Sequence, residues 1–189
     1  MTTVKWIRKI FHLPSTSIPI ICGVLGAIVF LIIYGNVPLI TTFDLWIRDS
    51  FVEHDVIGHY AGWLFFRNSP WSFPLGLSTN MGYPAGGIIS FTDSIPIIAI
   101  LFKILSPILP ETFQYFGIYV LICFVLQGVY SAKLIKLFTE KKLVIILGTI
   151  LFCYSPVMIE RAFRHTALAS HFLIISSLYS YFRSRRSCR

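Results

Sequence analysis

Residues 55–71 of the chain, DVIGHYAGWLFFRNSPW, bring charge and aromatic rings together between strongly apolar segments. If these residues form a helix, the i, i+4 spacing places Asp55 and His59 on one face, while Val56 and Trp63 lie on another. A polar face beside an aromatic face is typical of a helix at a lipid–water boundary. The stretch is therefore either an aromatic anchor without chemistry or an interfacial helix that carries a site.

The composition excludes an ordinary soluble domain. Of the 189 residues, 56% are hydrophobic and 13% are charged, and the mean hydropathy is +0.76. Soluble domains are roughly 45–50% apolar and about 25% charged. The net charge of +8 does not indicate a nucleic-acid partner, because the basic residues lie at the ends of apolar segments. We predict an all-α, polytopic membrane protein whose partner is the lipid bilayer, with no nucleic acid bound.

Four apolar segments predict about four transmembrane helices. The predicted spans cover residues 18–35, 113–138, 143–159 and 167–182. A basic lead-in (1–17) and a tail with four arginines (183–189) flank them. The positive-inside rule places both ends in the cytoplasm, which gives a multi-pass protein with a cytoplasmic N-terminus.

The first apolar segment, 18–34, has a second interpretation as a cleaved signal peptide. Its apolar run is longer than the usual core of a signal peptide, and no small-x-small cleavage site follows in YGNVPLI. We therefore expect an uncleaved membrane anchor.

The long connection 36–112 is expected on the outer side of the membrane. Residues 36–93 hold five of the eight acidic residues and no lysine, which is typical of a translocated loop. Prolines and glycines divide this part into short pieces. We expect short juxtamembrane helices near 41–52 and 55–67, followed by irregular backbone.

The segment 94–109 is apolar but short, and it contains Lys103 and interrupting prolines. Segments of this length are often interfacial or re-entrant. If it crossed fully, the lysine-rich end of the 113–138 span would lie outside the cell, against the positive-inside rule. We predict that it lies along the outer face or dips into the membrane and returns.

Three polar groups fall on the predicted outer side. They are Asp55 with His59, the step Thr92-Asp93-Ser94, and the sequence ERAFRH at the start of the predicted outer loop 160–166. Ionisable groups at membrane depth are costly and tend to face protein or a water-filled cavity, so we expect these groups to converge. The alternative is that all three lie in solvated loops and only mark the interface.

Two further expectations concern these charged residues. Arg161 and Arg164 have an alternative role in local pairing with Glu160. Asp55, alone or with a second acid, is the candidate ligand of a hard divalent cation such as Mg or Mn.

Other polar and small residues in the spans are expected to be structural. Gln114 and Gln127 predict hydrogen bonds between helices, and Gly117 and Gly128 predict close helix packing. His171 is expected to pack or to form a hydrogen bond rather than to bind a ligand.

Five motifs connect the chain to a known family. They are D-x-x-x-H-Y-x-G-W-x-F-F-R-x-x-P-W-x-F-P-L-G (55–76), Y-P-x-G (83–86), F-T-D-S-I-P (91–96), L-P-x-x-F-Q-Y-F-G (109–117) and R-H-x-x-L-x-x-H (164–171). With these motifs the chain from Asp55 to Arg183 resembles a family of bacterial polytopic membrane proteins. That family is similar to a branch of the GT-C glycosyltransferases, which use sugars linked to polyprenyl phosphate.

The resemblance implies a GT-C-like N-terminal module in the bacterial inner (cytoplasmic) membrane, with one span before a long outer loop. It implies that Asp55, the acidic residue of that loop, acts as the catalytic base or as a metal ligand. It also implies a polyprenyl-phosphate sugar donor as partner. The residues expected to bind the donor phosphate or the substrate are His59, Asp93, Glu160, Arg161, Arg164 and His165.

GT-C enzymes are usually several times longer than this chain. We therefore expect the sequence to be an N-terminal portion of a longer protein, inactive alone if the missing spans are required. The alternative function is that of a non-catalytic membrane protein, either a fragment of a transporter or flippase or an assembly subunit. Paired broken helices are typical of transporters, and the sequence offers one broken segment, 94–109.

Overall fold

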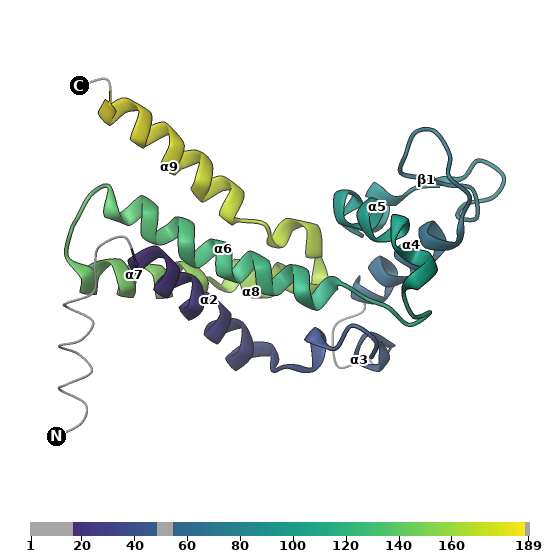
Figure 1. Cartoon of the computed structure of the whole chain (residues 1–189), viewed down its shortest axis with the longest axis horizontal. Helices are drawn as coiled ribbons and strands as arrows, with labels where there is room; N and C mark the ends of the chain where they lie inside the picture. The colour runs from purple at the N-terminus through teal and green to yellow at the C-terminus, as the bar shows by residue number, and fades with distance from the viewer. Residues whose placement is uncertain (1–16, 49–54, 188–189) are drawn as a thin grey trace. The chain divides into compact units, whose positions relative to one another are not determined.

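The computed structural model describes residues 17–48 and 55–187. It is mainly helical, which confirms the predicted all-α class apart from two short strands (Figure 1). In chain order the elements are α2 (Ile18–Tyr34), η1 (Val37–Leu39), α3 (Leu45–Arg48), α4 (Asp55–Asn68), β1 (Leu77–Ser78), β2 (Gly87–Ile88), η2 (Ile89–Thr92), α5 (Pro96–Ile104), η3 (Ser106–Ile108), α6 (Phe116–Lys136), α7 (Lys142–Cys153), α8 (Pro156–Arg164), η4 (Thr166–Ala169) and α9 (Phe172–Ser187).

The chain divides into two compact units. The first unit comprises the described parts of Met1–Gly35, Leu121–Met158 and Ser170–Arg189, and the second comprises the described parts of Asn36–Val120 with Ile159–Ala169. Apart from Ser17, the predicted lead-in falls outside the described residues. The predicted tail, 183–189, forms the end of α9 as far as Ser187.

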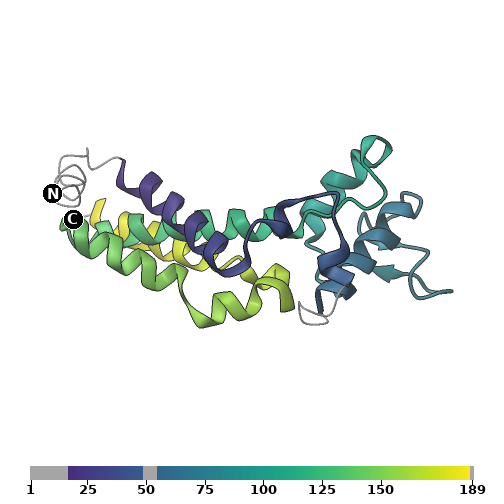
Figure 2. The same ribbon diagram turned by 90° about the horizontal axis from the view of Figure 1, so that it is seen from below.

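The first unit is a helix bundle held by close backbone contacts. α2 runs alongside α7, as Figures 1 and 2 show. A Cβ atom added at Gly26 would overlap the backbone of Phe124, and one added at Gly128 would overlap the backbone of Cys22. Gln127 Nε2 donates a hydrogen bond to the carbonyl of Phe152 at 3.4 Å. The predicted packing role of Gly128 and the predicted inter-helix bond of Gln127 are thus confirmed.

Helix length supports only part of the predicted topology. In the described part of the chain, α6, with 21 residues, is the one straight helix both long and apolar enough to cross a membrane. α7 and α8 form a second candidate if the pair, bent by 41° at a break, counts as one span. α2 is apolar but has 17 residues, whereas a hydrocarbon core of about 30 Å needs roughly 20. The helices therefore support one or two spans, and four remains a prediction.

The end of α8 corrects one predicted loop. The segment 160–166 was expected to be a loop, but α8 continues to Arg164 and η4 begins at Thr166. Pro156 starts this helix after a break, since proline fits the first helical turn. The predicted span 167–182 is also displaced, because η4 occupies its first residues and α9 begins only at Phe172.

The second unit is organised around α4, whose bounds confirm the helix predicted over 55–67. Trp63 is fully buried, and its Nε1 donates to the carbonyl of Phe113 at 3.0 Å. Phe66 is also fully buried. The prediction of an aromatic face toward lipid is therefore wrong for these two side chains, which pack against protein instead. Of the helix predicted near 41–52, the described part contains the four-residue α3.

α4 also fixes the segment that follows α5. The guanidinium of Arg67 donates to four carbonyls, those of Ser106, Leu109, Pro110 and Glu111. α5 has nine residues, roughly 14 Å of helix, which is too short to cross a bilayer. This length supports the prediction that 94–109 does not cross the membrane.

The beginning of α6 packs against η1. A Cβ atom at Gly117 would overlap the carbonyl of Pro38, which confirms close packing there. Gln114 precedes α6, and its Nε2 donates to the carbonyls of Pro38 at 2.9 Å and Ile40 at 3.1 Å. The side chain of Gln114 therefore bonds to η1 and to Ile40, the residue that follows η1, rather than to another α-helix.

Candidate functional site

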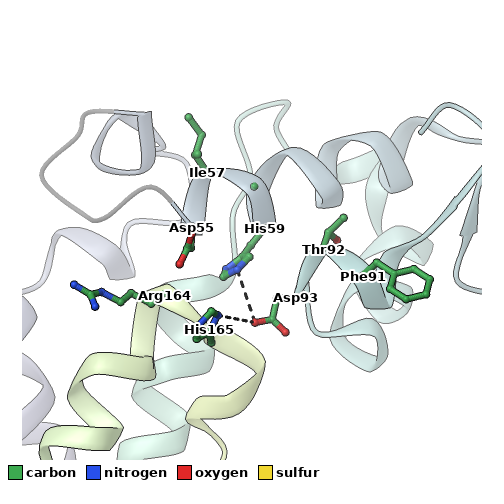
Figure 3. Close-up of a pocket in the computed structure, with 9 residues that line it drawn as sticks. Asp55, Ile57, His59, Phe91, Thr92, Asp93, Arg164 and His165 are labelled. Carbon is green, nitrogen blue, oxygen red and sulfur yellow. Dashed lines mark ion pairs between the residues drawn. The ribbon is translucent and has the colours of Figure 1, made fainter. Parts of the chain in front are cut away.

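Three segments of the second unit meet at an open pocket of about 530 Å³ (Figure 3). This volume lies within the roughly 300–1,000 Å³ of small-molecule sites. α4, the end of η2 and the end of α8 supply its lining, which consists of Asp55, Ile57, Gly58, His59, Phe91, Thr92, Asp93, Arg164 and His165. Each of the three polar groups expected on the outer side contributes some of its members to this lining.

Asp93 lies between two imidazoles. Its Oδ2 atom is 3.8 Å from Nε2 of His59 and 4.0 Å from Nδ1 of His165 (Figure 3). The side chain of His59 is 7% exposed, that of Asp93 31% and that of His165 48%. The carboxylate therefore has a buried imidazole on one side and a solvent-accessible imidazole on the other.

His59 is fixed from several directions. Its Nδ1 lies 3.1 Å from Oγ1 of the buried Thr166, and its ring lies beside Phe116. Its carbonyl accepts a hydrogen bond of 2.6 Å from Ser94 Oγ. These contacts suit an orienting residue better than the phosphate ligand that the resemblance implies.

Burial controls the protonation of His59. Removal from water lowers the pKa of its imidazole, and the nearby His165 lowers it further. The carboxylates of Asp93 and Asp55 act in the opposite direction but do not outweigh burial. His59 is therefore largely neutral at pH 7.

The backbone that carries Asp93 adopts an uncommon conformation. Asp93 has φ 56° and Ile95 has φ 50°, in the left-handed region that residues other than glycine seldom occupy. Ser94 between them is anchored twice: its Oγ donates to the carbonyl of His59, and its own carbonyl accepts from the hydroxyl of Tyr115. Such conformations persist where the surroundings over-determine them.

Gly62 brings this segment close to α4. A Cβ atom there would overlap the side chain of Thr92, whose Oγ1 donates to the carbonyl of Ile89 at 2.8 Å. The missing side chain on α4 therefore makes room for the turn that presents Asp93.

The remaining predicted residues divide into two groups. Asp55 and Arg164 line the pocket, whereas Glu160 and Arg161 are not among its lining residues. Arg164 Nη1 lies 3.0 Å from Glu160 Oε2, so the predicted local pairing is confirmed for Arg164. The expected substrate-binding roles of Glu160 and Arg161 gain no support from their placement.

Two contributions were not predicted from the sequence. Thr166 holds His59 although it lies 107 positions away, and no local pattern marks it. Phe91 and Ile57 form an exposed apolar part of the lining. The motif F-T-D-S-I-P contains Phe91, but the side chains around it become visible only in the fold.

The structure adds no support for the divalent cation expected on Asp55. Within residues 17–48 and 55–187, no group of three or more His, Cys, Asp or Glu side chains is arranged to hold a metal ion. A cation on Asp55 therefore remains a prediction.

Comparison with known proteins gives one match. A family model described as a domain of unknown function (DUF6311) matches residues 23–189, a range that contains every residue of the pocket. No curated protein and no solved structure matches the chain.

Proposed function

The chain belongs to the DUF6311 family, and we propose that it is a GT-C-type membrane glycosyltransferase or the N-terminal part of one. The donor is a sugar linked to polyprenyl phosphate, and the sugar passes to an acceptor hydroxyl on the outer face of the membrane. The observation that carries the proposal is the pocket itself. It gathers two carboxylates, two imidazoles and a guanidinium from three separate segments.

The lining suits both halves of such a donor. Sugar transfer to a hydroxyl needs a proton acceptor beside that hydroxyl, and carboxylate and imidazole groups supply it. The guanidinium of Arg164 matches a phosphate group, since its planar fork donates two parallel hydrogen bonds. Phe91 and Ile57 offer exposed apolar surface at the same pocket, which suits the first isoprene units of a lipid.

The proposal includes the four-span topology. In it α2, α6, the bent pair α7–α8 and α9 cross the bacterial inner membrane, and the N-terminus lies in the cytoplasm. The four lysines in the connection between α6 and α7 and beside it then face the cytoplasm, as the positive-inside rule expects. They are Lys133, Lys136, Lys141 and Lys142. This arrangement directs the end of α8, which carries Arg164 and His165, to the outer side.

The test is sugar transfer by the purified chain in lipid nanodiscs. A panel of radiolabelled polyprenyl-phosphate sugars is offered with simple glycosides as hydroxyl acceptors, and loss of sugar from the lipid is measured. We expect the wild type to consume at least one donor and Asp55→Asn to slow consumption at least tenfold. Glu140→Gln, which changes an exposed carboxylate outside the pocket, should retain the wild-type rate.

Two outcomes would oppose the proposal. If no donor is consumed and a photoreactive polyprenyl phosphate fails to label the pocket, the glycosyltransferase function is wrong. If the lipid is bound and moved across the bilayer without loss of sugar, the flippase alternative is correct.

A further inference from the structure

Asp93 Oδ2 faces two imidazoles, and their surroundings give them different capacities. His59 has Nδ1 against Thr166 Oγ1 at 3.1 Å and Nε2 toward Asp93 at 3.8 Å. Both of its ring nitrogens are directed at protein groups, and its side chain is nearly inaccessible. It can orient Asp93, and its burial leaves it little access to a ligand in the pocket.

His165 presents the opposite case. Its Nδ1 faces the same oxygen of Asp93 at 4.0 Å, and nearly half of its side chain is exposed at the pocket. Nε2 lies on the other edge of the ring from Nδ1, so this arrangement leaves Nε2 for a ligand. The backbone at His165 is fixed, because its N–H donates to the carbonyl of Arg161 at 3.1 Å and its carbonyl accepts from the N–H of Leu168 at 2.8 Å.

A carboxylate behind an imidazole is a recurrent catalytic arrangement. The carboxylate holds the proton-bearing nitrogen, fixes the tautomer and stabilises the imidazolium that forms when the other nitrogen accepts a proton. Separations of 3.8–4.0 Å are longer than hydrogen bonds. Catalytic contacts are often long without substrate and shorten when it binds.

We infer that His165 is the catalytic base of the proposed transfer and that Asp93 is its positioning residue, a conclusion that rests on the proposed function. The acceptor hydroxyl oxygen forms a bond to the anomeric carbon of the sugar. The bond from that carbon to the phosphate oxygen breaks, and polyprenyl phosphate leaves with the electron pair. The hydroxyl proton passes to Nε2 of His165 and is later released to solvent.

This assignment changes the role that the resemblance gives to Asp55. Asp55 shares the pocket, but it is the first residue of α4 and is exposed. Asp93 is the carboxylate within 4.0 Å of both imidazoles. Asp55 then serves to hold the acceptor by hydrogen bonds, while Arg164, paired with Glu160, faces the donor phosphate.

Nitrogen NMR tests the dyad without any assay of transfer. In the full chain in nanodiscs with ¹⁵N-labelled histidine, His165→Gln identifies the His165 signals. Neutral His165 should carry its proton on Nδ1, and Asp93→Ala should shift the proton to Nε2, the form that a free imidazole prefers. Asp55→Ala should leave the tautomer unchanged. Asp93→Asn, which keeps size and polarity, serves as a second variant if Asp93→Ala unfolds.

The transfer assay separates failure of this inference from failure of the proposed function. His165→Gln should slow sugar transfer by about 10²–10⁴-fold, the usual range for loss of a general base, and Asp55→Asn should slow it less. If Asp55→Asn abolishes transfer while His165→Gln retains it, the inference is wrong and the proposed function stands. If wild-type His165 carries its proton on Nε2, the inference is wrong whatever the outcome of the transfer assay.

Discussion

Nδ1 of His59 lies 3.1 Å from Oγ1 of Thr166, and both side chains are buried. Because Thr166 directly follows His165, this contact closes a ring of four residues. From Thr166 the ring passes to His59, then to Asp93, and returns through His165. The ring ties α4, the turn after η2 and the end of α8 into one site.

Thr166→Val removes the hydroxyl while it keeps the shape of the side chain. We expect the free energy of unfolding to fall by about 1–3 kcal/mol, because a buried ring nitrogen of His59 loses its partner. Thermal unfolding in detergent, followed by circular dichroism, measures the change. Thr112→Val is the matched control, since its hydroxyl donates to the carbonyl of Thr42 at an exposed position. Equal losses in the two variants would contradict a special role for Thr166.

The stability of the second unit should depend on pH through His59. Burial lowers the pKa of His59 in the folded protein, whereas in the unfolded chain the pKa of the imidazole is about 6.5. As pH falls below about 6.5, the unfolded state binds a proton that the folded state does not, so unfolding becomes easier. Above that pH both states are neutral and the contribution is constant.

The measurement compares melting temperatures at pH 7.5 and pH 5.5. We expect a lower value at pH 5.5 in the wild type and a smaller difference in His59→Gln. His165→Gln, which changes the exposed imidazole, should keep most of the difference. A difference of unchanged size in His59→Gln would assign the effect to other groups.

Gly62 and Gly58 provide a matched pair on one helix. A Cβ atom at Gly62 would overlap Thr92, whereas nothing lies within 4 Å of one at Gly58. Gly62→Ala should destabilise the protein by about 1–3 kcal/mol, the range for overpacking. Gly58→Ala should stabilise it by up to about 1 kcal/mol through helix propensity. Thermal unfolding of both variants tests this difference. A stabilised Gly62→Ala variant would contradict it and would show that the segment around Thr92 shifts without loss of stability.

The sequence allowed α4 and the candidate polar residues on it to be predicted for identifiable reasons. An acidic first residue and a proline after the last turn delimit the helix. The cost of charge at membrane depth indicated that Asp55, Asp93 and His165 face protein or a water-filled cavity, whereas their meeting in one pocket follows only from the fold. These arguments use local pattern and solvation, which a single sequence contains.

The parts that could not be predicted depend on long-range partners. The sequence pattern was consistent with a lipid-facing anchor at Trp63, because an aromatic side chain can pack against either lipid or protein. Only the fold places the carbonyl of Phe113 at its Nε1. The helical state of Glu160 to Arg164 was missed because a short charged segment between apolar runs resembles a loop. The i, i+4 pair that supports the helix was recognised only as an alternative role for the arginine.

Arg67→Lys should loosen the segment after α5. The guanidinium donates to four carbonyls in 106–111, and a lysine ammonium cannot reproduce that planar fork. We expect a loss of about 2 kcal/mol, given roughly 1.5–3 kcal/mol for a hydrogen bond to a charged group and partial exposure here. Hydrogen exchange should accelerate in the amides of 106–113. Arg48→Lys, at an exposed pair with Asp44, is the control and should change little.

The four-span topology predicts which loops face outward, and cysteine labelling tests it. Asn80 is exposed in the second unit, and Glu140 is exposed in the connection between α6 and α7. In inverted and right-side-out vesicles, a membrane-impermeant maleimide should reach Asn80→Cys only from the outer side and Glu140→Cys only from the cytoplasmic side. The background chain carries Cys188→Ser, because the other three cysteines are buried. If Glu140→Cys and Asn80→Cys are both labelled from outside, 94–109 crosses the membrane. If Glu140→Cys is labelled from outside and Asn80→Cys from the cytoplasmic side, the outward orientation proposed for the pocket is reversed.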